Sequence, residues 1–232
     1  MSRLLVIYYS AYGHIYKMAK AAAEGARDAG SEVRICRIPE FDSERNRTPF
    51  LDQWRKEEDS ELSRRFKTVD RFSAYEKALE LQKEIPIATN DDLRWADGIV
   101  WGFPTRYGSM PAQVKLFLEF ASDLLAGGVL EGKPAGIITS AGSIHTGHES
   151  TLLTAMVPLF HFGMLIVGLP YSENLEYLTA DPIGGSPYGA STLAGPDGSM
   201  EPEERELLMA KRLGKRVANA AAALHSVGFL KG

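Results

Sequence analysis

The apolar run RLLVIYY at residues 3–9 constrains the fold of this chain more than any other segment. The run is almost uninterrupted and rich in β-prone residues, which is typical of a parallel strand buried on both faces. Residues 14–29 follow with apolar side chains spaced three and four apart, and Gly30 marks the end of the expected helix. Because such a strand needs cover on both faces, this opening predicts the first βα unit of a parallel sheet.

The same alternation continues along the chain. Further strands are expected at residues 31–38, 97–103, 134–141 and 163–171. Further helices are expected at residues 111–125, 148–160 and 202–225, with Pro158 ending or kinking the second of them. Strands that alternate with helices form right-handed βαβ units, which predicts an α/β fold with helices on both faces of a parallel sheet. No internal repeat or linker divides the sequence, so we expect a single domain over residues 1–232.

Two segments do not fit this alternation. Residues 41–84 carry many charges of both signs that nearly cancel, and the stretch YEKALELQKE within them is helical in composition. We expect a solvated helical excursion there, with a lid or partner element as the alternative. Residues 184–200, GGSPYGASTLAGPDGSM, contain so much Gly, Pro and Ser that they predict an irregular loop, placed at a site or an interface.

Composition narrows the class of protein. Hydrophobic residues make up 44% of the chain and charged residues 24%, which is ordinary for a soluble globular domain. The formal net charge of -4 disfavours binding to a nucleic-acid backbone. No apolar run is long enough to span a bilayer. The single cysteine, Cys36, is expected to be a buried, inert thiol, and the lack of a possible internal disulfide fits a reducing, cytoplasmic location.

Three acid-poor loops follow the first, third and fourth expected strands: SAYGHI, PTRYGSMP and SAGSIHTGHES. Ligands of open parallel sheets bind beyond the carboxyl ends of the strands, so these loops are expected to line one pocket. In the first loop, unpaired N–H groups of the opening helix turn could hold an anion, assisted by the Ser10 hydroxyl and by close backbone approach at Gly13. An ordinary capped junction between strand and helix is the alternative.

The second loop suggests a flat ligand. Tyr107 could pack against a heteroaromatic ring and Arg106 could compensate charge, while a plain βα turn with one surface arginine is the alternative. Backbone N–H groups of this loop could also face such a ring. A metal site formed by His145, His148 and Glu149 is disfavoured, because no further firm ligand and no HExxH pattern accompany them.

The stretches YYSAYGHIYKMA, GFPTRYGSMPAQVKLFL, HFGMLIVGLPY and GGSPYGASTLAGPDGS together resemble the WrbA family of FMN-dependent NAD(P)H:quinone oxidoreductases, within the flavodoxin-like superfamily. They extend from the N-terminus to about residue 200. The resemblance implies a flavodoxin-like three-layer sandwich with a five-stranded parallel sheet in the order 2-1-3-4-5. It also implies bound FMN, a homotetramer, and two-electron reduction of quinones by NADH or NADPH through ping-pong hydride transfer.

The resemblance further implies which residues form the site. Those implied for the FMN phosphate are Ser10, Ala11, Tyr12, Gly13, His14 and Ile15. Those implied for the flavin ring are Pro104, Thr105, Arg106, Tyr107 and Gly108. Those implied for the ribityl chain and the ring edge are Ser140, Ala141, Gly142, Ser143, Thr146 and Gly147. The third loop is bulkier than the family's STGTGGGQ-like loop, which leaves the contacts of Ile144, His145 and Thr146 open.

Three residues carry further implied roles. Tyr12 would meet the nicotinamide, and Leu125 would stand at the mouth of the pocket, where family members can carry a tryptophan. His161 would reach the flavin site from a neighbouring subunit, with a buried, hydrogen-bonded histidine as the alternative. No catalytic side chain is certain, and Tyr12 and His161 are the candidates for moving a proton.

Two other functions stay open from sequence. A flavodoxin-type electron carrier would hold FMN without reduction by NAD(P)H, and a regulatory protein would bind flavin or a partner without turnover. The longer loops and the segment 184–200 suggest a formed pocket and an interface, which favours an enzyme over an electron carrier. The acidic balance and the lack of a basic helix argue against direct DNA contact.

Overall fold

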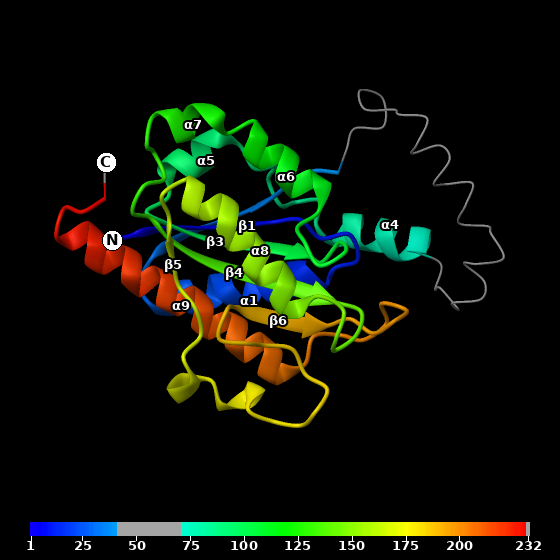
Figure 1. The fold of residues 1–232 in the computed structure, drawn as a ribbon. Coiled ribbons are helices and arrows are strands. Elements are labelled where there is room, and N and C mark those ends of the chain that lie inside the picture. The colour runs from blue at the N-terminus through cyan, green and yellow to red at the C-terminus, as the bar shows by residue number, and fades with distance from the viewer. Residues whose placement is uncertain (41–70, 231–232) are drawn as a thin grey trace.

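The structure of this chain, a computed structural model, describes residues 1–40 and 71–230, with side chains from residue 74 in the second range. The expected excursion therefore lies outside the described residues over 41–70. The described strands form a parallel sheet, drawn as arrows in Figure 1. They are β1 (Arg3–Tyr8), β2 (Glu32–Arg37), β3 (Gly98–Pro104), β4 (Pro134–Ala141), β5 (Leu165–Ile166) and β6 (Ala190–Leu193). The strand order β2-β1-β3-β4-β5 confirms the expected order, and β6 is an addition that pairs with β4.

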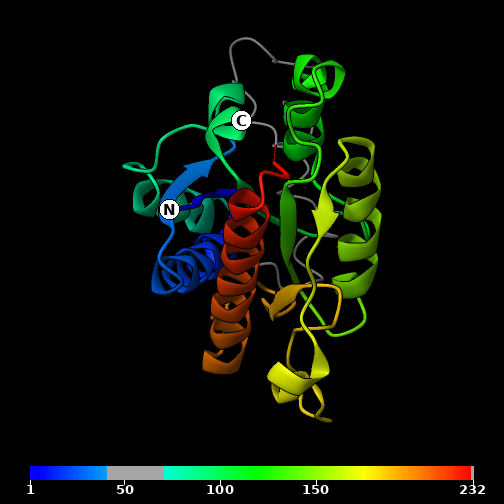
Figure 2. The same cartoon turned by 90° about the vertical axis from the view of Figure 1, so that its left-hand side faces the viewer.

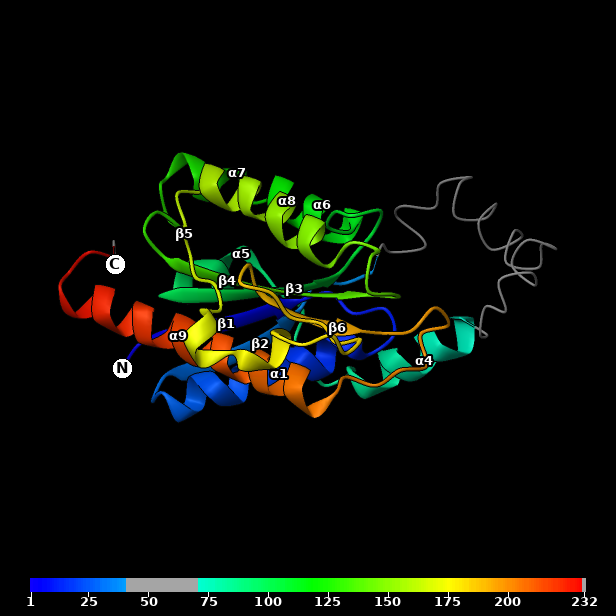
Figure 3. The ribbon, with the colours of Figure 1, turned by 60° about the horizontal axis from the view of Figure 1, so that its bottom comes forward.

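Helices cover both faces of this sheet, as Figure 2 and Figure 3 show. The described helices are α1 (His14–Asp28), α4 (Arg71–Leu81), α5 (Asn90–Trp95), α6 (Ala112–Glu119), α7 (Ser122–Ala126), α8 (His148–His161) and α9 (Glu204–Ser226). Helices α1 and α9 lie against one face, and α6, α7 and α8 lie against the other. None of the helices that the structure describes is both long and apolar enough to cross a membrane.

Strand β1 explains why the sheet needs two helical layers. Leu4 and Val6 belong to the buried cluster shared with α1 and α9, whereas Leu5 and Ile7 belong to the cluster shared with α5 to α8. All four side chains are fully buried, and each contributes about 1.5–3 kcal/mol relative to an exposed position. The expectation of a strand buried on both faces is confirmed. Cys36 of β2 is also buried, as expected, and burial raises the pKa of its thiol to about 11.

The fifth position of the sheet is divided between two short strands. Strand β5 pairs with Pro134 and Ala135 at the start of β4, while β6 pairs with residues 138–141 at its end. Both strands lie along the edge of β4 that β3 leaves free. The expected strand at 163–171 is therefore correct only for Leu165–Ile166, and the expected irregular loop at 184–200 is wrong for Ala190–Leu193. Pairing with β4 overrides the weak strand propensity of this segment.

A buried carboxylate holds β6 in place. Glu206 is only 2% exposed. Its Oε1 accepts hydrogen bonds from the N–H groups of Gly184 and Leu193, at 2.8 and 2.9 Å. Its Oε2 accepts from the hydroxyl of Thr192 and from the N–H of Glu203, at 2.6 and 2.9 Å. One side chain in the first turn of α9 thus joins a loop, a strand and a helix start.

Two helices differ from their expected bounds. The helix expected at 111–125 is divided into α6 and α7, where the Ala121 N–H bonds the Leu118 carbonyl and tightens the turn. Helix α8 continues past Pro158 to His161, because a proline in the last turn removes only one hydrogen bond of the helix. The helical composition of YEKALELQKE is confirmed over most of its length by α4.

We predict that Glu206→Gln lowers the free energy of unfolding by about 1–3 kcal/mol, because the amide points an N–H group at protein donors inside a buried site. Urea denaturation at neutral pH measures the change. Glu204→Gln is the matched control, since Glu204 is an exposed acid in the same turn of α9. Equal stability of the two variants would contradict the role given to Glu206.

Candidate functional site

The parallel ladder brings the three loops to one edge of the sheet. The N–H of Tyr9 bonds the carbonyl of Gly102 at 2.8 Å, which joins the ends of β1 and β3. The N–H of Thr105 bonds the carbonyl of Ser140 at 2.8 Å, which joins the ends of β3 and β4. The loops that follow these strands therefore lie side by side, at the right-hand end of the sheet in Figure 1.

The first loop leaves the start of α1 open to an anion. Gly13, with φ of 93°, is the residue before the helix, and a Cβ added there would meet nothing within 4 Å. The Ser10 hydroxyl accepts the N–H groups of Gly13 and Tyr16, at 3.2 and 3.3 Å. The first turn of α1 contains no acidic residue, whereas α5 and α9 both begin with acids and capping boxes. The partial positive charge at the start of α1 is therefore not neutralised by its own residues.

Two histidines join the loops to residues 184–200. His14 is buried, and its Nε2 donates to the carbonyl oxygen of Met200 at 2.9 Å. His148 is also buried, and its Nδ1 lies 2.9 Å from the hydroxyl of Ser191. Burial lowers the pKa of both imidazoles, so both are neutral at pH 7. Residues 184–200 are thus an ordered wall beside the starts of α1 and α8.

The second loop presents an exposed aromatic ring. Tyr107 has a left-handed φ of 55° and a relative exposure of 106%. A bulky residue in that conformation is uncommon, and such strained residues cluster at functional sites. Arg106 is exposed beside it, and its guanidinium donates to the carbonyl of Thr105 at 3.0 Å. Both side chains are accessible to a ligand at this edge.

Most N–H groups of the second loop are already bonded within the chain. Thr105 donates to the Ser140 carbonyl, Arg106 donates to the Ser109 carbonyl at 2.8 Å, and Gly108 donates to the Thr105 hydroxyl at 3.2 Å. The structure records no such bond for the N–H of Tyr107 among the residues it describes. Of the four N–H groups of residues 105–108, Tyr107 N–H is therefore the one without a recorded partner within the described residues, and the Arg106 guanidinium is the other donor that the loop offers.

The third loop closes against the second. The N–H of Ser143 bonds the hydroxyl of Thr146 at 3.1 Å, which forms a tight turn that exposes Ile144 and His145. Gly147 has φ of 117°, and a Cβ there would lie 2.6 Å from the Thr105 hydroxyl. Only glycine fits this contact between the loops. Thr151, which the sequence did not single out, donates to the same Thr105 hydroxyl at 2.7 Å.

Of the other expected site residues, Tyr12 is half-buried at the loop edge and packs against the cluster under α5 to α8. Leu125 in α7 and His161 at the end of α8 lie at the opposite end of the sheet, where Gly132 N–H bonds the Gly163 carbonyl. Within one chain these two residues do not join the three loops. His161 is exposed, so the alternative of a buried, hydrogen-bonded histidine is wrong.

Sequence reasoning missed a polar cluster behind the first loop. The hydroxyl of Tyr9 donates to Glu40 Oε2 at 2.6 Å, and Gln113 Nε2 donates to the same hydroxyl at 3.2 Å and to Glu40 Oε1. Burial and the nearby carboxylate raise the pKa of Tyr9. In the sequence, this cluster is indicated only by the hydroxyl-bearing Tyr9 at the end of a buried strand.

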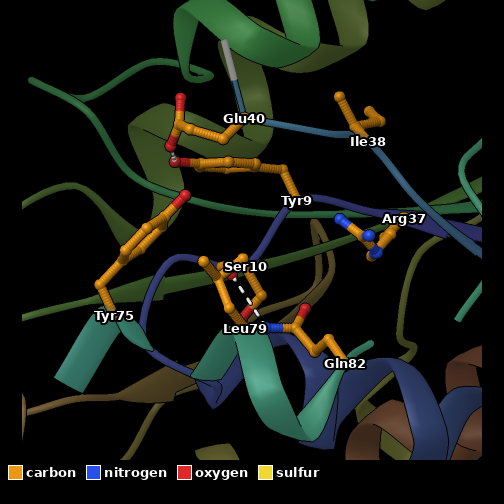
Figure 4. A pocket seen from close by; sticks show the side chains of 8 residues that line it. All are labelled: Tyr9, Ser10, Arg37, Ile38, Glu40, Tyr75, Leu79 and Gln82. Carbon is orange, nitrogen blue, oxygen red and sulfur yellow. Dashed lines mark hydrogen bonds between the residues drawn. The ribbon is translucent and has the colours of Figure 1, made fainter. Parts of the chain in front are cut away.

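A pocket lies beside this cluster, as Figure 4 shows. Its lining residues are Tyr9, Ser10, Arg37, Ile38, Glu40, Tyr75, Leu79 and Gln82. No group of three metal-binding side chains occurs in the ranges 1–40 and 71–230. Ser10 belongs both to the lining of this pocket and to the first loop.

We predict that Gly147→Ala lowers the free energy of unfolding by about 1–3 kcal/mol more than Gly198→Ala does, because only the first places a methyl group against a packed neighbour. Both glycines have positive φ, but a Cβ at Gly198 meets nothing within 4 Å. Thermal or urea denaturation of the two variants measures the difference. If the two losses were the same, the close contact between the second and third loops would be refuted.

Comparison with known proteins places this geometry in a family. The family model described as NADPH-dependent FMN reductase matches residues 2–172. A protein of Caulobacter vibrioides (strain NA1000 / CB15N) named NAD(P)H dehydrogenase (quinone) is 40% identical, over 97% of this chain and 100% of its own length. A protein of Rhodopseudomonas palustris (strain TIE-1) with the same name is 41% identical, over 97% of this chain and 100% of its own length.

Solved structures agree on the fold. A flavodoxin, WrbA-like protein from Agrobacterium tumefaciens has a TM-score of 0.59 and 23% identity, covering 96% of this chain and 99% of that one. A flavodoxin from the domain Archaea has a TM-score of 0.55 and 17% identity, covering 95% of this chain and 99% of that one. These likenesses confirm the expected flavodoxin-like fold. On the match over residues 2–172 and the full-length relatives, the chain belongs to the NADPH-dependent FMN reductase family.

Proposed function

We propose that this protein is an FMN-dependent NAD(P)H:quinone oxidoreductase. One observation carries the proposal: three acid-poor loops meet at one edge of the sheet, around a helix start that no acidic side chain of its own turn neutralises. The full-length relatives named NAD(P)H dehydrogenase (quinone) give the reaction class that such an edge would serve.

The residues at this edge fit FMN. The start of α1 offers neutral donors and a glycine with open space beside it, which suits a phosphate held by Ser10, Ala11, Tyr12, Gly13, His14 and Ile15. The second loop, Pro104, Thr105, Arg106, Tyr107 and Gly108, would contact the ring. The third loop, with Ser140, Ala141, Gly142, Ser143, Thr146 and Gly147, would border the ribityl chain. Bound FMN supplies an acceptor for hydride from NAD(P)H and a donor of two electrons to a quinone.

The chain's own groups would stabilise charge and supply a proton. The Arg106 guanidinium and the Tyr107 N–H are the donors of the second loop that stay available for a negatively charged ring edge. Tyr12 and His145 are the side chains on the loops themselves that could move a proton. Because NAD(P)H and the quinone would enter one opening in turn, we propose ping-pong kinetics.

A homotetramer would complete the site. Leu125 and His161 lie at the far end of the sheet, so a neighbouring copy has to bring them to the loops if they act there. Leu153, Val157 and Phe160 form an exposed apolar stripe along α8, next to His161. A second copy packed on this stripe would bury it and could carry His161 toward another chain's site. We also propose a cytoplasmic location, in keeping with a single buried thiol.

The decisive experiment loads the purified protein with FMN, removes the excess, and adds NADH or NADPH without oxygen. We predict rapid bleaching of the visible flavin band and its recovery on adding a benzoquinone. Filtration after reduction is the control, because flavin that stays with the protein is a cofactor and flavin that leaves it is a substrate, as in an FMN reductase.

Two results would contradict the proposal. Flavin that stays oxidised until a chemical reductant is added would favour an electron carrier. Failure of the protein to retain flavin at any concentration would remove the cofactor and favour a binding protein without redox activity.

A further inference from the structure

We infer that Gln82 is a positioning residue for the loop that is proposed to hold the FMN phosphate, so the inference rests on the proposed function. Gln82 directly follows α4 and is 3% exposed. Its Nε2 donates to the carbonyl oxygen of Ser10 at 3.2 Å, the bond drawn in Figure 4, and to that of Ala78 at 2.7 Å. A residue within the charged 41–84 segment thus contacts the backbone of the first loop.

The hydrogen bond from Gln82 is made to Ser10, the residue that also holds two backbone groups at the start of α1. Ser10 uses its hydroxyl to accept the N–H groups of Gly13 and Tyr16. Gln82 donates to the carbonyl oxygen of the same residue. With both groups of Ser10 engaged, the peptide between Ser10 and Ala11 has a fixed orientation. The directions of the N–H groups that would meet a phosphate depend on that orientation.

Gln82 is itself held firmly. The N–H of Arg37 bonds the Pro86 carbonyl and the N–H of Ala88 bonds the Arg37 carbonyl, both at 2.9 Å. The guanidinium of Arg37 also donates to the carbonyl of Ile85 at 3.1 Å. These bonds attach residues 85–88 to the end of β2, so the segment after Gln82 has a fixed anchor in the sheet. A side chain on such an anchor can set the position of a neighbouring loop.

The chemistry of the amide suits this place. Both partners of Gln82 Nε2 are carbonyl oxygens, so the position requires two N–H donors. A neutral amide supplies them without adding charge behind an anion site. A carboxylate of the same shape would point oxygen at two carbonyl oxygens, and a leucine of similar size would leave the Ser10 carbonyl without this partner.

The test compares two flavins that differ only in the phosphate. Apoprotein is titrated with FMN and with riboflavin, and quenching of flavin fluorescence gives each Kd. The variants are Gln82→Leu and Gln82→Glu, and Glu84→Gln is the control for an exposed side chain on the same segment. We expect Gln82→Leu to raise the Kd of FMN up to about tenfold, the worth of one buried hydrogen bond. Gln82→Glu should raise it further, and the Kd of riboflavin should change less than about twofold for either variant.

A second measurement keeps the test valid if one of the Gln82 variants folds poorly. The ³¹P resonance of bound FMN should shift or broaden in whichever Gln82 variant folds and stay unchanged in Glu84→Gln, while kcat at saturating FMN stays at the wild-type value. Equal losses for FMN and riboflavin would overturn the inference, because a general structural role would explain them. An unchanged Kd of FMN would overturn it as well. A wild-type protein that binds neither flavin would overturn the proposed function itself, and the inference with it.

Discussion

The parallel pairing of β1 with its neighbours is the constraint on which the rest of the structure depends. Parallel strands end at the same edge, so the bonds from Tyr9 to Gly102 and from Thr105 to Ser140 bring three distant loops together. The two-sided burial of β1 requires helices on both faces of the sheet and puts β1 in its interior. The position of the candidate site follows from this buried strand and from the parallel ladder that it forms with its neighbours.

Polar contacts to segments outside the three loops then hold the loops in position. Glu206 holds β6 against the end of β4, and the buried His14 and His148 join residues 184–200 to the two helix starts. Gln82 donates to the Ser10 carbonyl of the first loop. Glu206 and Gln82 hold these segments in place without being proposed to touch a ligand. Together they give the loops a rigid frame, which is what binding a phosphate and a flat ring at one edge requires.

Much of this could be predicted from the sequence, and the exceptions have physical causes. Strand β4 was predicted with its observed bounds, because its apolar run is continuous and local pattern suffices. Strand β6 was missed, because a segment so rich in Gly and Ser becomes a strand only through β4 and Glu206. The loops could be found from their small residues, but the internal use of N–H groups in residues 105–108 depends on contacts with β4 and with the loop's own side chains. The role of Gln82 likewise arises from packing between segments far apart in sequence.

The most direct test of the account is a crystal structure of the protein grown with FMN. The account predicts that the phosphate accepts hydrogen bonds from N–H groups within residues 10–15, at the start of α1, and that the ring lies beside Tyr107. A phosphate bound elsewhere, with the first loop unchanged and the start of α1 empty, would contradict it.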